Sequence, residues 1–328
     1  MLTKDFGRTG RKVGQVGFGA WAIGGSWGHV EASEAKAALN AALDAGVTFI
    51  DTADVYGDGR SERLIAEVLE ERGGTRPFVA TKAGRRLPRQ ETAGYSEQNL
   101  SDWVDRSLRN LRVETLDLLQ LHCPPADLYR RPEVFERLDR MVEAGKIKAY
   151  GVSVEAVEEA LEAIKRPGVA SVQIIFNMFR RKPIDAVFAA AKSRQVAIIA
   201  RVPLASGLLT GKFRSESKFD ASDHRQFNRN GEAFDVGETF SGVDYETGLA
   251  AVEKIRPLVG GDATLAQFAL RWILMFDAVT VVIPGAKTAI QARANTAASE
   301  LAPLSDAVMA EVAAIYDRDI RPLVHHRW

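Results

Sequence analysis

Four side chains suited to proton transfer lie just after short apolar segments of the chain: Asp51, Tyr56, Lys82 and His122. A free tyrosine has a pKa of about 10, which is high for an acid that works near neutral pH. A neighbouring lysine ammonium favours the phenolate and lowers that pKa, and a carboxylate holds the lysine in place. A histidine can hydrogen-bond a carbonyl oxygen and orient it. The set therefore predicts proton donation to a carbonyl, with hydride from a nicotinamide cofactor.

Each of these residues also has an ordinary structural interpretation. Asp51 could cap a helix, Lys82 could be a solvated strand end, and His122 could be a hydrogen-bonded core residue. Tyr56 could pack on the rim of the fold. Buried unpaired charges are costly, so an Asp, a Lys and a His that meet in one place must pair or act on something. The functional interpretation therefore depends on how the chain places them.

Eight short apolar segments rich in Val, Ile and Phe recur along the chain: 16–18, 48–50, 78–80, 116–121, 149–152, 171–176, 197–200 and 279–283. They are too short to be helices and are typical of buried parallel strands. Between them lie amphipathic segments with helix-start and helix-end signals: 33–45, 61–69, 96–111, 132–144, 155–164, 183–192, 264–276 and 288–299. This alternation predicts an α/β fold, a closed (β/α)₈ TIM barrel that forms one domain over residues 1–328.

The barrel places its active site at the carboxyl ends of the strands, where Asp51, Lys82 and His122 are expected. An open doubly wound sheet would need a glycine-rich phosphate turn, and Gly17-Phe18-Gly19-Ala20-Trp21 lacks the third glycine. An N-terminal β-hairpin is expected over 5–13, with Thr9-Gly10 as its turn. The long segment 205–242, after strand seven, is expected to be a functional cover. The tail 325–328 is expected to fray or make lattice or subunit contacts, with folding over the substrate mouth as the alternative.

Composition excludes several classes of protein. The 328 residues contain 43 basic and 43 acidic side chains with no long run of one sign, which argues against nucleic acid or a membrane surface as partner. No segment is long and apolar enough to span a membrane, and the start does not resemble a signal peptide. The single cysteine, Cys123, is interpreted as structural, and a cytoplasmic location is expected. The five histidines form no His-x-His pattern, so no metal site is expected.

The ordered motifs resemble the aldo-keto reductase family over nearly the whole chain. They are Asp51-Thr52-Ala53-Asp54-Val55-Tyr56-Gly57, Thr81-Lys82, Leu121-His122, Gly151-Val152-Ser153, residues 203–212, Ile283-Pro284-Gly285-Ala286-Lys287 and residues 291–295. Within that family, the motifs are most similar to those of the bacterial stress-protein and potassium-channel β-subunit branch. The resemblance implies that Tyr56 is the general acid, tuned by Lys82 and Asp51, and that His122 positions the carbonyl. Trp21, Tyr56 and His122 would contact substrate, and Trp27, Tyr95 and Phe179 are further candidates by position.

The resemblance also implies a set of cofactor contacts. Ala20, Trp21 and Asp51 would flank the nicotinamide ribose, and Ser153 and Gln173 would hydrogen-bond the carboxamide. The pyrophosphate would follow Arg201, Val202, Leu204, Ser206, Gly207 and Lys212. Lys287 and Gln291 would contact the 2′-phosphate and Asn295 the adenine, with Arg225 closing over the cofactor. Independently, Gly285 opens a strand-to-helix turn, and a helix N-terminus next to Lys287 is an anion site.

NADP (NADPH) is therefore expected as cofactor, with NAD as a secondary one. Two departures bear on this expectation. Arg201 stands where many family members stack an aromatic residue on the nicotinamide, and a guanidinium can stack or reach a phosphate. Gly285 and Gln291 stand where the steroid-reducing branch has basic residues, which leaves room for dual cofactor use. The expected activity is reduction of a small-molecule carbonyl substrate; a sugar or polyol dehydrogenase and an NADPH-sensing regulatory subunit remain alternatives. The sequence indicates no oligomeric state.

Overall fold

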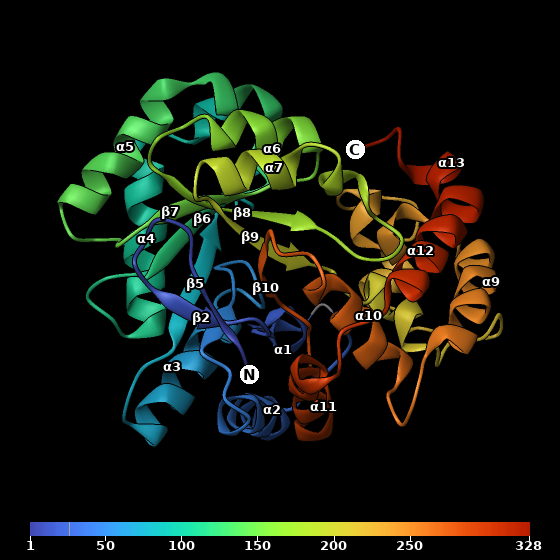
Figure 1. The fold of residues 1–328 in the computed structure, drawn as a ribbon. Helices are drawn as coiled ribbons and strands as arrows, with labels where there is room; N and C mark the ends of the chain where they lie inside the picture. The colour runs from blue at the N-terminus through green and yellow to red at the C-terminus, as the bar shows by residue number, and fades with distance from the viewer. Residues whose placement is uncertain (26) are drawn as a thin grey trace.

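The computed structural model describes residues 1–25 and 27–328 and is built around a sheet of eight parallel strands, β3 to β10, in chain order (Figure 1). The sheet closes on itself because Gly17 donates to the carbonyl of Val282 at 2.8 Å, and Val282 donates to that of Gln15 at 2.9 Å. The expected barrel is confirmed. The strands are β3 Phe18–Gly19, β4 Phe49–Asp51, β5 Phe78–Ala83, β6 Leu118–His122, β7 Tyr150–Ser153, β8 Val169–Ile175, β9 Ala197–Arg201 and β10 Val279–Val282.

Helices surround the strands on the outside (Figure 1). In α4, Ser96 caps the helix by accepting from the amide of Asn99 at 3.2 Å, and Leu100, Val104 and Leu111 are buried, as the sequence predicts. The helices are α1 Trp21–Gly24, α2 Ala32–Asp44, α3 Arg60–Arg72, α4 Glu97–Leu111, α5 Pro132–Glu143, α6 Val157–Ile164, α7 Val187–Ser193, α8 His224–Phe227, α9 Tyr245–Ile255, α10 Leu265–Leu274, α11 Ala289–Ala297, α12 Asp306–Ile315 and α13 Arg321–Val324.

Two predicted helices begin later than expected. The helix expected from residue 155 begins at Val157, because the Glu159 carboxylate accepts from the amides of Glu155 and Ala156 at 2.9 and 3.1 Å. The helix expected over 183–192 is divided into a 3-10 turn, Lys182–Ile184, and α7, because Ala186 leaves the helical region at φ −143°.

The N-terminal hairpin closes the amino-terminal end of the barrel. Its strands β1 (Thr3–Asp5) and β2 (Lys12–Gly14) pair antiparallel, as predicted. Between them Phe6 is fully buried against Phe49 and Phe78, with ring centroids 5.4 and 4.9 Å away. This aromatic floor excludes water from one end of the barrel, so the opposite end is the one left for chemistry.

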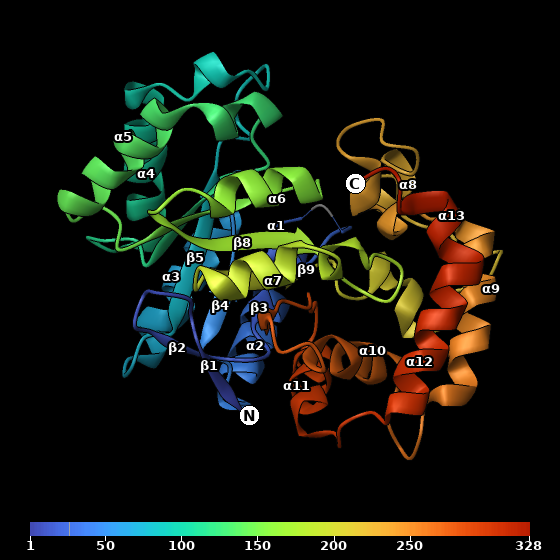
Figure 2. The same cartoon turned by 45° about the horizontal axis from the view of Figure 1, so that its top comes forward.

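The segment after β9 lies beside the C-terminal residues, near α8 and α13 (Figure 2). Trp328 is 6% exposed, and its indole N–H donates to Asp235 at 3.1 Å. The Arg180 guanidinium lies 3.5 Å from its ring centroid. The expectation that the tail frays was wrong, because the terminal indole gains both an apolar seat and a hydrogen-bond partner there. Among the described helices, none has the length and apolarity needed to cross a membrane.

Candidate active site

Three adjacent strands bring the predicted polar residues to one end of the barrel. Asp51 ends β4, Lys82 lies near the end of β5, and His122 ends β6. Parallel pairing aligns Asp51 with Ala80 and His122 with Ser153. Because parallel strands end at the same edge of the sheet, these side chains meet at the carboxyl-terminal end of the barrel, as the sequence predicts.

Lys82 is the centre of this group. Its side chain is 1% exposed, and its ammonium donates to Asp51 at 2.6 Å, to the Tyr56 hydroxyl at 3.3 Å and to the carbonyl of Thr52 at 3.0 Å. An ammonium has three protons, so these three acceptors use its full donor capacity. Asp51 and Tyr56 are thus connected through one buried cation.

Burial and charge act against each other on the two titrating groups. Burial alone would lower the pKa of Lys82, but Asp51 and Tyr56 raise it above its ordinary value. Burial raises the pKa of Tyr56, and Lys82 offsets only part of that rise. The sequence-based expectation of a lowered tyrosine pKa was therefore wrong in sign, since desolvation of the phenolate outweighs its attraction to the ammonium. Tyr56 holds its proton at neutral pH.

The second oxygen of Asp51 is fixed by two buried amides. Gln173 donates to it at 2.7 Å and Gln120 at 3.2 Å, and the Gln173 amide also donates to Gln120 at 3.2 Å. Gln173 was expected to contact a carboxamide, whereas Gln120 was missed, although a polar side chain inside the apolar segment 116–121 was a signal for it. Charge-assisted bonds of this kind hold the carboxylate in one orientation.

His122 lies beside Tyr56, with ring centroids 5.9 Å apart and planes at 84°. Burial, reinforced by Arg85, Lys82 and Arg201, lowers its pKa well below the ordinary value. The imidazole is therefore neutral at pH 7. Its Nδ1 has no hydrogen-bond partner among the described residues. A buried polar atom without a protein partner is one that a bound water or ligand group would satisfy.

Aromatic side chains cover the tyrosine. The Trp21 ring stacks on that of Tyr56 with centroids 6.1 Å apart, and it lies 4.8 Å from the His224 ring. The Trp27 ring lies 4.4 Å from the same histidine. Burial lowers the pKa of His224 to about 4, so this residue is a neutral part of the cover. Of the further aromatic candidates, Tyr95 and Phe179 lie within the hydrophobic core at 0% and 1% exposure, and their contact with substrate stays a prediction.

Beyond His122 lies a cluster of ion pairs, here called the mouth cluster: Arg85, Glu155, Arg201 and Glu238, beside the Cys123 thiol. Arg85 donates to Glu155 at 2.8 Å and to Glu238 at 2.7 Å, and Arg201 lies 3.3 Å from Glu238. Burial would raise the pKa of Glu238, but the two guanidiniums lower it to about 2. Arg85 and Glu238 were missed by sequence reasoning because Glu238 lies in the long segment after β9.

Arg201 is not placed for stacking in this arrangement. Its guanidinium is engaged by Glu238 and donates to the carbonyl of Val154 at 3.0 Å, with the Cys123 sulfur 3.8 Å away. Cys123 is half-buried, and its thiol lies 3.5 Å from the Ser153 hydroxyl. The cation that replaces an aromatic residue at this strand end thus serves the mouth cluster.

The segment that follows β9 has an unusual backbone. Val202, Ala205 and Ser206 have φ of 51°, 47° and 54°, and Gly207 has φ of 102°. A β-branched residue in the left-handed region is strained and must be held by its surroundings. Asn177 donates to the Val202 carbonyl at 2.8 Å, and the Ser206 hydroxyl donates to the carbonyl of Glu238 at 2.9 Å. The turn is therefore preorganised, and the carbonyl of Leu204 accepts from Gly207 at 2.9 Å within it.

The residues expected at the phosphate end of a cofactor also gather. The Lys287 ammonium donates to the carbonyl of Trp27, and the Arg225 guanidinium lies 4.9 Å from the Trp27 ring centroid. Arg225 pairs with Asp223 at 2.5 Å. The Gln291 amide oxygen accepts from the Lys287 backbone at 2.8 Å, and Asn295 donates to Gly285 at 3.1 Å. Lys212, which follows the strained turn in the chain, is exposed. Ala20 is buried, and its backbone amide donates to the carbonyl of Asp51 at 2.8 Å.

These contacts fit a dinucleotide phosphate. Lys287 contacts the Trp27 backbone carbonyl, and Arg225 lies over the Trp27 ring and donates to the Ser206 carbonyl in the strained turn at 3.4 Å. The Trp27 indole N–H is buried without a partner among the described residues. Residues 15–317 match the profile described as "Aldo/keto reductase family". The chain belongs to this family.

Relatives from bacteria and plants agree with the branch that the sequence motifs indicate. The chain is 29% identical over 282 residues to "Aldo-keto reductase YhdN" of Bacillus subtilis, covering 85% of this chain and 83% of that one. It is 28% identical over 319 residues to "Probable voltage-gated potassium channel subunit beta" of Arabidopsis thaliana, covering 93% of each. Both relatives thus match nearly end to end.

Solved structures confirm the fold. The chain is similar to the aldo-keto reductase AKR11C1 of Bacillus halodurans in its holo form, with a TM-score of 0.76, 24% identity and 96% coverage of both chains. It is also similar to the glycerol dehydrogenase AKR11B4 of Gluconobacter oxydans, with a TM-score of 0.73, 29% identity and coverage of 94% and 93%. The family places the chain among oxidoreductases that act on carbonyl or alcohol groups.

One carboxyl between Asp51 and Tyr56 makes stability depend on pH. Asp54 is fully buried, neither oxygen has a partner among the described residues, and burial, with the nearby Glu62, raises its pKa from 3.8 to about 7. Between these values the unfolded chain ionises while the folded chain keeps the proton. The free energy of unfolding should therefore fall as pH rises from about 4 to about 7, by on the order of 4 kcal/mol.

Asp54→Asn has no carboxyl at this position, so its free energy of unfolding should not fall in this way as the pH rises. The difference in stability between the variant and the wild type should therefore favour the variant more at pH 8 than at pH 4. Urea unfolding of both chains at the two pH values measures the difference. The exposed Asp262→Asn is the matched control and should show no such change with pH. A pH-independent difference for Asp54→Asn would mean that the carboxyl is already ionised in the folded protein.

Proposed function

We propose that this protein reduces aldehydes or ketones to alcohols with NADPH, and that Tyr56 donates the proton. The observation that carries the proposal is the single ammonium of Lys82 shared by Asp51 at 2.6 Å and Tyr56 at 3.3 Å, with the His122 ring beside the phenol. When bound, NADPH supplies the hydride, which no side chain can provide.

The chain's own residues account for the proton. Tyr56 keeps its proton because its pKa is raised, and it donates the proton to the carbonyl oxygen as negative charge develops there. Lys82 then stabilises the phenolate that is left, and Asp51 keeps Lys82 charged and in position. The neutral His122 has an imidazole N–H to donate to the carbonyl oxygen, which orients the substrate for transfer.

The cofactor would lie across the mouth of the barrel. Trp21 stacks on Tyr56, Gln173 donates to Asp51, and Ser153 pairs in register with His122, so these three residues would surround the nicotinamide end. The strained turn of Val202 to Gly207 would follow the pyrophosphate. Lys287 and Arg225 would hold the 2′-phosphate, which favours NADP over NAD. Both cations now contact Trp27, so binding would exchange a backbone carbonyl and an indole face for a phosphate.

A second candidate is the oxidation of a sugar or polyol by the same residues in reverse. The mouth cluster favours it, because two guanidiniums and two carboxylates offer many donors and acceptors to hydroxyl groups. The similar protein from Gluconobacter oxydans is named a glycerol dehydrogenase. We also infer that residues 1–328 act as one catalytic domain on a small molecule in the cytoplasm, in keeping with the balanced charge and single cysteine.

Tyr56→Phe should lower kcat/KM for aldehyde reduction by about 100-fold or more, because it removes the proton donor. Loss of NADPH absorbance with 4-nitrobenzaldehyde, methylglyoxal and simple sugars measures the rate. Tyr129→Phe is the matched control, since its buried hydroxyl has no partner among the described residues. If wild type and Tyr56→Phe give equal rates with every substrate, the proposal that the protein is a reductase fails.

Lys287→Gln should weaken NADPH binding by about tenfold and leave NADH binding nearly unchanged, because only NADPH carries the 2′-phosphate. Titration of each dinucleotide, followed by quenching of tryptophan fluorescence, gives the two affinities. The exposed Lys218→Gln is the control for loss of one positive charge. Equal weakening of both dinucleotides would remove Lys287 from the 2′-phosphate site.

A further inference from the structure

We propose a second ligand site at the amino-terminal end of the barrel that binds a small phosphate ester with an aromatic or apolar body. The site, here called the basal pocket, is a hollow of about 630 Å³. Its walls are the hairpin, the connection from α2 to β4 and the connection from α3 to β5. It is lined by Arg11, Lys12, Leu43, Gly46, Val47, Thr48, Leu69, Arg72, Gly73, Gly74, Thr75, Arg76, Pro77 and Phe78.

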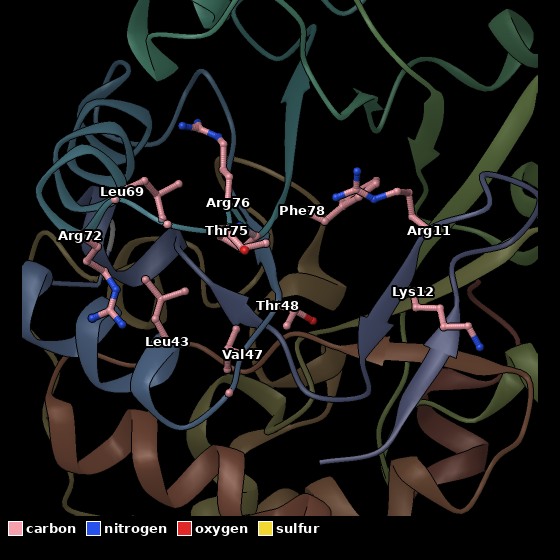
Figure 3. A pocket seen from close by; sticks show the side chains of 14 residues that line it. Arg11, Lys12, Leu43, Val47, Thr48, Leu69, Arg72, Thr75, Arg76 and Phe78 are labelled. Atoms are coloured by element: carbon pink, nitrogen blue, oxygen red, sulfur yellow. The ribbon is translucent and has the colours of Figure 1, made fainter.

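The charge of the basal pocket is entirely of one sign. Among the residues that the structure describes, its lining contains four cationic residues and no carboxylate, in a chain whose basic and acidic residues balance at 43 each. Figure 3 shows Arg11 and Lys12 on the hairpin at one side of the hollow, and Arg72 and Arg76 at the other. A concave surface lined by one sign of charge concentrates ligands of the opposite sign.

Two of the four cations are available to a ligand. Lys12 pairs with Asp5 at 3.5 Å, and Arg72 donates to Asn40 and Asp44 at 2.8 Å each, so these two already have partners. Arg11 has no ion pair within the described parts of the chain, and its guanidinium lies 5.8 Å from the Phe78 ring centroid. Arg11 can therefore direct donors into the hollow.

Arg76 is the second available cation. It is half-buried, and one nitrogen donates to the carbonyl of Leu111 at 3.3 Å. Burial lowers the pKa of Arg76, and Asp117 and Glu70 offset part of that effect. A guanidinium that has lost water without gaining a close carboxylate gains from a bound anion.

The apolar residues at the bottom of the basal pocket, here called its floor, favour a ligand whose phosphate is attached to an apolar group. Leu43, Val47, Leu69 and Phe78 give it an apolar surface between the cations (Figure 3). The Cβ positions of Gly46, Gly73 and Gly74 have no atom within 4 Å, so the rim is open to a ligand. The volume is that of ordinary small-molecule sites. A ligand with its ring on the floor and a phosphate toward which the Arg11 and Arg76 side chains turn would use both surfaces.

The basal pocket is separate from the candidate active site. Thr48 and Phe78 lie at the amino ends of the strands that carry Asp51 and Lys82 at their carboxyl ends. The aromatic floor of Phe6, Phe49 and Phe78 lies between the two sites. A ligand in the basal pocket therefore does not compete with substrate or with the dinucleotide.

Isothermal titration of the full chain with phenyl phosphate tests the proposal directly. We expect saturable binding of one ligand per chain, tighter than that of inorganic phosphate, which lacks the ring, and of benzyl alcohol, which lacks the charge. Inorganic phosphate that binds as tightly as phenyl phosphate would contradict the role of the apolar floor. An absence of saturable binding by all three compounds in the millimolar range would overturn the site.

Single substitutions locate the binding. Arg11→Gln and Arg76→Gln should each weaken phenyl phosphate binding about tenfold, whereas the exposed Arg89→Gln should not. Arg11 is exposed on the hairpin, so its variant should keep the thermal stability of the wild type. Lys287→Gln separates this site from the proposed dinucleotide site. Binding lost in Lys287→Gln but kept in both arginine variants would place the ligand in the active-site mouth and overturn the proposal.

Discussion

The buried ion pair of Lys82 and Asp51 is the interaction on which the candidate active site depends. Two charges at 1% and 4% side-chain exposure are stable only when their geometry is good and their remaining hydrogen-bond capacity is filled. The Thr52 carbonyl and the Tyr56 hydroxyl accept the remaining hydrogen bonds of the ammonium. The side-chain amides of Gln120 and Gln173 donate to one oxygen of the carboxylate. Five side chains from four strands and one loop are thereby held in one arrangement.

The barrel explains why such a costly arrangement can form. Closure between β3 and β10 fixes the stagger of the strands, and the aromatic floor at the hairpin end makes that end dry. The opposite end is left for polar groups, and the segment after β9 covers it. Trp328 seats one part of this segment through Asp235, and Ser206 binds another part through Glu238. The covering segment is thus held in place by a contact with the C-terminal residue and by a contact within the segment itself.

Most of the barrel could be predicted from the sequence because its signals are local. Apolar segments of three to six residues and capped helices such as α4 can be identified from nearby residues alone. Asp51, Lys82 and His122 could be placed together because strand ends in a barrel meet at one face. The sign of the Tyr56 pKa shift could not be predicted, because it depends on how much water the completed cover excludes.

The mouth cluster was out of reach for a related reason. Arg85 and Glu238 are separated by 153 residues, and no local pattern indicates that a carboxylate in a long loop will meet a guanidinium at a strand end. The ion pair of Arg201 with Glu238 could not be predicted for the same reason. The resemblance to the family supplied the cofactor contacts, whereas the basal pocket follows only from the spatial arrangement of three separate connections.

A double-mutant cycle between Asp51→Asn and Tyr56→Phe tests the central claim most directly, with kcat for NADPH-dependent aldehyde reduction as the readout. If Asp51 acts through Lys82 on Tyr56, its loss should matter only while the phenol is present. The account predicts that the double variant is no slower than Tyr56→Phe alone. Additive losses, with the double variant slower by the product of the two single effects, would contradict it.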